Sequence, residues 1–119
     1  MDIKIKRIYD DAQDSDGFRI LVDALWPRGL SKERARIDYW ARDIAPSDTL
    51  RKWFNHEPSK WDEFKVRYWN ELDSKLDHVK ELMRIINEKD KVTLLFSAKD
   101  RERNNAVALL EYIRSKSNY

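Results

Sequence analysis

Two apolar runs far apart in the chain constrain its fold more than any other feature of the sequence. FRILVDALW at residues 18–26 and KVTLLFSA at residues 91–98 are rich in strand-forming residues, and Arg19 and Asp23 are the polar exceptions in the first run. Continuous apolar runs of this length are typical of strands buried on both faces of a parallel sheet. We therefore predict that these two strands are central and parallel in one sheet.

Helical periodicity fills most of the chain between and after these strands. Apolar residues recur at spacings of three and four in three stretches, which predicts three amphipathic helices, the first of them starting near Pro58. Their apolar stripes are Trp61, Phe64, Tyr68 and Leu72; Leu76, Val79, Leu82, Met83 and Ile86; and Ala106, Val107, Leu109, Leu110 and Ile113. Two shorter helices are expected near 32–36 and over 48–54, because the serines that precede them are good N-caps.

The remaining segments complete a small single domain over residues 1–119. A half-buried strand is expected at 3–9, residues 10–17 have the composition of a turn or loop, and 37–44 carries no assignable pattern. Buried strands separated by helices favour an α/β fold with at least one parallel pair, in a sheet of about three to four strands. The predicted core side chains are Trp61, Phe64, Tyr68, Leu82, Ile86, Leu109 and Ile113.

The absence of cysteine excludes disulfides, thiolate metal sites and thiol nucleophiles from this chain. With only two histidines, His56 and His78, a histidine metal cluster is not expected, and no metal site is predicted. No apolar run approaches the roughly 18 residues of a membrane span. Residues 1–10 alternate apolar and charged side chains and lack the apolar segment of a signal peptide. We therefore expect a cytoplasmic protein without a membrane partner.

The two buried strands direct attention to the loops that follow them. Ligands of open α/β sheets bind at the carboxyl ends of the strands, and in parallel strands these ends meet at one edge. One such loop is DALWPRG at 23–29, and the other is SAKDRERNN at 97–105. The second loop enters the last helix, where free N–H groups and basic side chains favour an anion, although the glycines of a P-loop are missing. The candidate ligand-binding residues are Trp26, Arg28, Ser97, Lys99, Asp100, Asn104 and Asn105.

Asp23 and His56 are the candidate catalytic residues. A carboxylate within an apolar run must be paired, hydrogen-bonded or neutralised, so Asp23 is either a structural ion-pair partner or an acid–base group. His56 is a candidate base for which the sequence indicates no orienting partner. The loops have structural alternatives too: Asp100 as the N-cap of the last helix, the paired asparagines bonding to loop backbone, and Arg28 pairing with Asp23 or Asp43.

Three classes of function are consistent with these residues. The first is an enzyme-like domain that binds an anionic small molecule at the strand ends, for which the sequence indicates no cofactor, substrate or reaction. The second is a nucleic-acid-binding module that uses Arg51, Lys52, Trp53 and the basic loop 99–103, and the net charge of only +2 argues against it. The third is an interaction or oligomer subunit without catalysis, which tryptophan exposed on one helix face would favour.

The chain also carries a recognisable series of short motifs. LWPRG, DIAPS, LRKWF, the His-x-Pro of His56 and Pro58, and NNA follow one another in this order between Lys6 and Tyr112. In this order they resemble the YeaO-like branch of the family called domain of unknown function 488. The resemblance implies a compact α/β domain of the prokaryotic cytoplasm and brings no activity with it.

Two positions depart from that family's usual pattern. Ala24 stands where the family has arginine, and Arg103 stands where it often has histidine. If either position were catalytic, this member would be impaired. More distant branches carry a Cys-His-Arg sequence in the corresponding strand-to-helix loop, which is similar to the thiol loops of rhodaneses and phosphatases. Because this chain has no cysteine, that thiol chemistry is excluded here.

Overall fold

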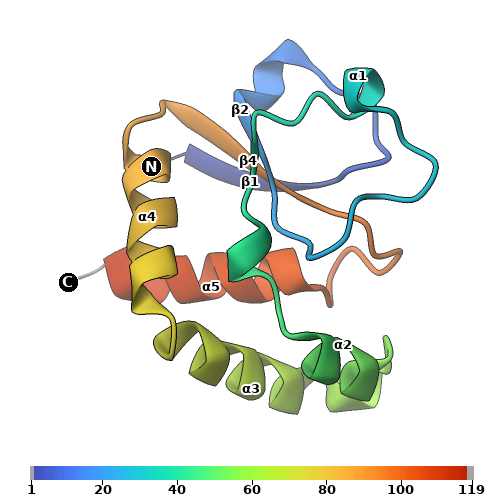
Figure 1. Cartoon of the computed structure of the whole chain (residues 1–119), viewed down its shortest axis with the longest axis vertical. Coiled ribbons are helices and arrows are strands. Elements are labelled where there is room, and N and C mark those ends of the chain that lie inside the picture. The colour runs from blue at the N-terminus through green and yellow to red at the C-terminus, as the bar shows by residue number, and fades with distance from the viewer. Residues whose placement is uncertain (1, 118–119) are drawn as a thin grey trace.

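A four-stranded, wholly parallel sheet organises the computed structural model, which describes residues 2–117. The strands are β1 (Asp2–Arg7), β2 (Phe18–Leu21), β3 (Tyr39–Trp40) and β4 (Lys91–Phe96), in the order β1-β4-β2-β3 (Figure 1). The two predicted buried strands are therefore the central pair and are parallel, in the register Ile20 with Leu94. This arrangement confirms the α/β prediction.

The predicted strands were too long, and the contacts at the strand ends explain the difference. β2 ends at Leu21 instead of Trp26: Val22 N still donates to Leu95 O, but Leu25 is 65% exposed. β4 ends at Phe96, because the N–H of the next residue, Ser97, donates to the carboxylate of Asp23 in the loop after β2. β1 spans 2–7 instead of 3–9, since Asp10 N donates back to Arg7 O in a turn. The unassigned stretch 37–44 holds β3 and one 3₁₀ turn.

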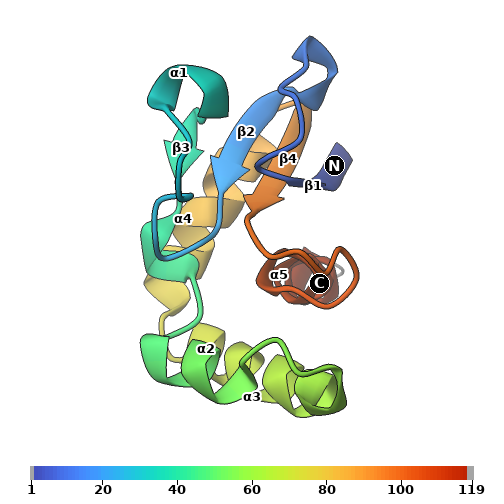
Figure 2. The ribbon, with the colours of Figure 1, turned by 90° about the vertical axis from the view of Figure 1, so that its right-hand side faces the viewer.

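Within residues 2–117 the sheet is accompanied by five α-helices: α1 (Lys32–Ala35), α2 (Asp48–Phe54), α3 (Trp61–Asp73), α4 (Leu76–Asn87) and α5 (Asn105–Ser117). The two predicted serine caps are confirmed, since Ser31 Oγ accepts from Arg34 N and Ser47 Oγ from Leu50 N. α5 packs against β1 and β4, whereas α2 and α3 form the layer farthest from the sheet (Figures 1 and 2).

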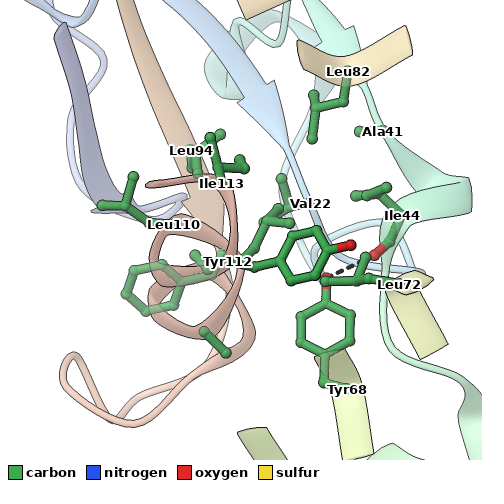
Figure 3. Packing of buried hydrophobic residues seen from close by; sticks show 14 of the residues in the cluster. Val22, Ala41, Ile44, Tyr68, Leu72, Leu82, Leu94, Leu110, Tyr112 and Ile113 are labelled. Atoms are coloured by element: carbon green, nitrogen blue, oxygen red, sulfur yellow. Dashed lines mark hydrogen bonds between the residues drawn. The ribbon is translucent and has the colours of Figure 1, made fainter. Parts of the chain in front are cut away.

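The main core lies between the sheet and helices α3, α4 and α5. It includes Ile20 and Leu94 from the strands and Val22 just after β2, together with Tyr68, whose hydroxyl donates to Ile44 O at 2.6 Å (Figure 3). Of the predicted core residues, Trp61 is only partly buried, and the others are buried in this cluster: Phe64, Tyr68, Leu82, Ile86, Leu109 and Ile113. A second, smaller cluster of Ile8, Leu21, Ala35 and Leu95 covers the opposite face of the sheet.

Candidate functional site

The two predicted loops meet at Asp23, at the carboxyl edge of the sheet. Asp23 Oδ2 accepts hydrogen bonds from Ser97 N at 2.9 Å and from Ser97 Oγ at 2.7 Å. Asp23 Oδ1 accepts from Asn105 Nδ2 at 2.9 Å, and the same amide donates to Val22 O. These contacts bind the end of β2 to the end of β4 and to the first residue of α5. Asp23 is therefore hydrogen-bonded, and no ion pair involving it occurs among residues 2–117, so the ion-pair alternative is wrong.

Two residues at and just after the end of the first strand hold the same loops from the other side, and neither was among the site residues predicted from the sequence. Arg7 donates from Nε to Ala98 O at 2.8 Å and from Nη2 to Ser97 O at 3.2 Å. Tyr9 donates from its hydroxyl to Arg28 O at 2.9 Å, and its ring lies 4.9 Å from the Arg7 guanidinium carbon. Only the strand order reveals this role, because it places the end of β1 beside β4.

The polar residues of the loop 97–104 mostly stabilise the loop itself. Asp100 Oδ1 accepts from Glu102 N and Arg103 N, and these backbone hydrogen bonds lower the pKa of the Asp100 carboxyl. Asn104 is the residue that caps α5, since its Oδ1 accepts from Val107 N while its Nδ2 donates to Asp100 O. The alternative in which Asp100 caps the last helix is therefore wrong, because the helix begins later than that alternative requires.

Trp26 packs inward over the smaller core cluster. Its indole N–H donates to Leu30 O at 2.7 Å, and its ring meets Trp40 edge to face with 5.6 Å between centroids. Trp40 in turn donates its indole N–H to Asp23 O at 2.7 Å. The WPRG turn is thereby attached to β3 and to the backbone of Asp23, and Gly29 provides a positive φ of 76° at its end.

Arg28, Lys99 and His56 take no part in this network with their side chains. Arg28 and Lys99 are exposed, and within residues 2–117 neither side chain has an ion pair or hydrogen bond, so Arg28 does not pair with Asp23 or Asp43. Arg101, in contrast, forms a bidentate ion pair with Asp10. His56 is exposed just after α2, with its ring 6.3 Å from that of Phe54. In the described part of the chain no hydrogen bond joins His56 to Asp23, Ser97 or Asn105.

The residues proposed for nucleic-acid contact are largely engaged with their own neighbours. Arg51 and Lys52 both pair with Asp48, at 2.7 and 2.9 Å. The centre of the Trp53 ring lies 5.1 Å from Lys60 Nζ and 4.2 Å from the Arg67 guanidinium carbon. These contacts occupy the charges and the ring that a base-stacking surface would present.

Two hollows of the described surface lie away from the predicted residues. The larger, of about 470 Å³, is lined by Gly17, Phe18, Asp38, Lys89, Asp90 and Lys91 at the amino ends of the strands. The smaller lies between β3 and α4. Across residues 2–117, no group of three or more His, Cys, Asp or Glu side chains is placed to hold a metal ion. No helix in that same range is long and apolar enough to cross a membrane.

Comparisons with known proteins agree with the motifs. The chain is 44% identical to the uncharacterized protein YeaO of Escherichia coli K12 over 117 residues, which cover 97% of this chain and 99% of that protein. It is also 44% identical over 70 residues to the uncharacterized proteins Rv3073c of Mycobacterium tuberculosis H37Rv and Mb3100c of Mycobacterium bovis, covering 59% of each chain. No solved structure matches this chain.

The family model that matches spans residues 2–118 and therefore includes both loops of the carboxyl edge. Its description reads "Inactive DUF488-N3 subclade". The LWPRG and NNA motifs fall within this match, and Asn105 of NNA donates to Asp23, two residues before LWPRG. The chain belongs to the domain of unknown function 488 family, in its YeaO-like branch and in the subclade described as inactive.

Proposed function

We propose that this protein is a binding domain without catalytic activity, and that it holds an anionic small molecule at the carboxyl edge of its sheet. One observation carries the proposal: Arg28 and Lys99 project from the two loops of that edge, and within residues 2–117 neither has a partner. Guanidinium and ammonium groups are common protein ligands of phosphate and carboxylate groups.

The rigidity of the two loops supports binding there. The Asp23 hydrogen bonds, the Arg7 bonds to Ser97 and Ala98, and the Tyr9 bond to the Arg28 carbonyl restrain both loops from opposite sides. A site whose backbone is fixed before the ligand arrives loses less conformational entropy on binding. The unpartnered cations therefore extend from a preorganised frame.

The same geometry argues against acid–base chemistry. Three donors already bind the two carboxylate oxygens of Asp23, which leaves it suited to positioning the loops. His56 forms no hydrogen bond with the Asp23 cluster within residues 2–117, and a general base needs both reach and an orienting partner. The description of the matching family model as inactive supports the same conclusion. Nucleic acid fits less well, because Arg51 and Lys52 are paired with Asp48.

Thermal unfolding in the presence of anions tests the proposal. Phosphate, sulfate, sugar phosphates, nucleotides and dicarboxylates are compared with chloride at equal ionic strength. At least one anion is expected to raise the Tm, since a ligand that binds only the folded state stabilises it. Arg28→Ala and Lys99→Ala are each expected to reduce that shift.

Lys80→Ala serves as the matched control, because Lys80 is also exposed and unpartnered within residues 2–117 but lies on α4. It is expected to leave the anion response unchanged. The proposal is wrong if no anion raises the Tm above chloride, or if Lys80→Ala reduces the shift as much as Arg28→Ala does. A response to nucleic acid that falls steeply with salt, and is unaffected by both edge variants, would favour the nucleic-acid alternative.

A further inference from the structure

Residues 25–42 form one side of the molecule, here called the β3 flank. After β2 the chain turns at the WPRG motif, runs back to α1 and then forms β3 beside β2 (Figure 2). α4 and α5 pack against the other face of the sheet, so the flank has no helical layer outside it (Figure 2). Its outward side chains therefore face solvent in this structure.

Apolar surface is exposed on this flank. Leu25 is 65% exposed, the highest value among the large hydrophobic side chains of residues 2–117. Next to it in sequence, Trp26 is only partly buried, as is its neighbour Trp40. Because both indole N–H groups already donate to backbone carbonyls, the exposed parts of these rings are apolar. Tryptophan and arginine are enriched among the hot-spot residues that contribute most of the binding energy of protein interfaces.

The flank also has an excess of positive charge. Residues 25–42 contain five basic residues (Arg28, Lys32, Arg34, Arg36 and Arg42) and two acidic ones (Glu33 and Asp38), a net charge of +3. The whole chain has a net charge of +2, so the remaining residues together have a charge of −1. Lys32 and Arg34 are exposed, and within residues 2–117 their side chains have no partner.

The strand at this side of the sheet has an open edge. β3 pairs with β2 alone, and within residues 2–117 no other strand pairs with its outer side. An unpaired edge presents backbone N–H and C=O groups to which an extended segment can hydrogen-bond. The flank thus combines an open strand edge, apolar anchors and excess positive charge.

We infer that the β3 flank is a docking surface for an acidic, extended segment of a partner protein that inserts one apolar side chain beside Leu25 and Trp26. A single-stranded nucleic acid fits less well, because base stacking needs an open ring face. The Arg42 guanidinium lies over the Trp40 ring, 3.9 Å from its centre, and the Trp40 and Trp26 rings pack edge to face. A second copy docking through the same flank would bring like charges together.

The flank shares Arg28 with the proposed anion site, so its test leaves Arg28 unchanged and substitutes other residues of the flank. Short random peptides displayed on phage are selected against the immobilised full-length protein. The best peptide is then synthesised and titrated by fluorescence anisotropy at low and high salt. The selected peptides are expected to be rich in aspartate and glutamate around one aliphatic or aromatic residue, and the affinity is expected to fall with salt.

Two variants and two matched controls locate the binding surface. Leu25→Ser and Arg34→Glu are each expected to weaken binding about fivefold or more, the size of effect typical of an interface anchor. Val66→Ser removes an equally exposed apolar side chain from α3, and Lys80→Glu reverses an exposed charge on α4; both are expected to leave binding within about twofold. All four positions are exposed, and circular dichroism melts confirm that each variant is folded.

Three results would overturn the inference. One is a selection that yields no acidic peptide, and another is a peptide whose affinity survives both Leu25→Ser and Arg34→Glu. The third is self-association in light scattering that disappears in Leu25→Ser, which would assign the flank to a second copy of this chain. Because the anion response is measured separately with Lys99→Ala, failure of the docking surface leaves the anion site independently testable.

Discussion

Asp23 accepts two hydrogen bonds from Ser97 through a single carboxylate oxygen, one from the backbone N–H and one from the side-chain hydroxyl. The pair joins residues 74 positions apart in the chain and fixes the ends of the two central strands against each other. Both loops of the proposed anion site therefore depend on one half-buried carboxylate for their relative position.

The first prediction is that Asp23→Ala destabilises the fold. Removal of the carboxylate leaves the Ser97 and Asn105 donors without their charged acceptor, which is expected to cost about 2–3 kcal/mol. Urea unfolding of the purified variant measures this loss. Asp43→Ala is the control, because the only ion pair of exposed Asp43 within residues 2–117 is a 3.8 Å contact with His78, and its expected effect is within about 0.5 kcal/mol. Equal losses in the two variants would contradict a special role for Asp23.

The second prediction concerns Asp16, whose fully buried carboxylate pairs with Lys4, Lys6 and Arg19. Burial alone would raise the pKa of Asp16, but hydrogen bonds from Gln13 N and from the three cations outweigh it and hold the pKa far below its usual value. Because the folded-state pKa lies below the unfolded value near 3.9, ionised Asp16 stabilises the protein at neutral pH. That stabilisation is lost as the pH falls below about 4 and through the folded-state pKa.

Asp16→Asn tests this dependence. The variant is expected to lose about 3–5 kcal/mol at neutral pH, because the buried Arg19 guanidinium loses its charge partner. The difference from the unmodified protein should narrow as the pH is lowered below about 4. Urea melts at stepwise pH measure both effects. Asp14→Asn, at a neighbouring and fully exposed side chain, should follow the unmodified protein at every pH. If the difference in the free energy of unfolding between Asp16→Asn and the unmodified protein stayed constant down to the lowest pH, the charge of Asp16 would not be the cause of the stability loss.

The third prediction separates core from surface on a single helix. Phe64 is buried on α3 and stacks on Phe54 with 4.4 Å between ring centroids, so Phe64→Ala is expected to cost about 3–5 kcal/mol. Val66 lies two residues later on the same helix and is 61% exposed, so Val66→Ala should change stability by less than about 0.5 kcal/mol. Denaturant melts of the two variants provide the comparison. A loss below about 1 kcal/mol for Phe64→Ala would mean that the burial of this ring contributes little.

The sequence predicted the strands and helices well where apolar residues form a continuous run or recur at helical spacing. The runs at 18–26 and 91–98 predicted the central parallel pair, and the stripe that includes Phe64 and Tyr68 predicted α3. The apolar pattern does not show where the strands end, because long-range hydrogen bonds determine these ends. β2 and β4 end earlier than predicted, and Ser97 N donates to Asp23 just beyond their ends. The two residues are far apart in the chain, so no short stretch of sequence shows this contact.

The carboxyl edge was likewise predicted only in part. Parallel pairing brought Asp23, Ser97 and Asn105 into contact, as two loops at one edge require. Arg7 and Tyr9 were missed, because their role depends on the first strand lying beside the last. The charged stretch 10–17 was interpreted as a loop from its composition. Composition does not reveal that Asp16 is buried there, since the three cations that neutralise it come from β1 and β2.

The fourth prediction compares the two glycines of the chain, Gly17 and Gly29. Both have positive φ, 66° and 76°, so alanine is strained at either position by about 1–3 kcal/mol. Their surroundings differ: a Cβ on Gly17 would lie 2.5 Å from Lys91 O, whereas a Cβ on Gly29 meets nothing within 4 Å. Gly29→Ala should therefore show the backbone strain alone. Gly17→Ala should lose clearly more stability than Gly29→Ala, because the start of β4 must move away from the turn before β2. Urea unfolding of both variants measures the difference, and similar losses would show that the backbone at Lys91 yields without cost.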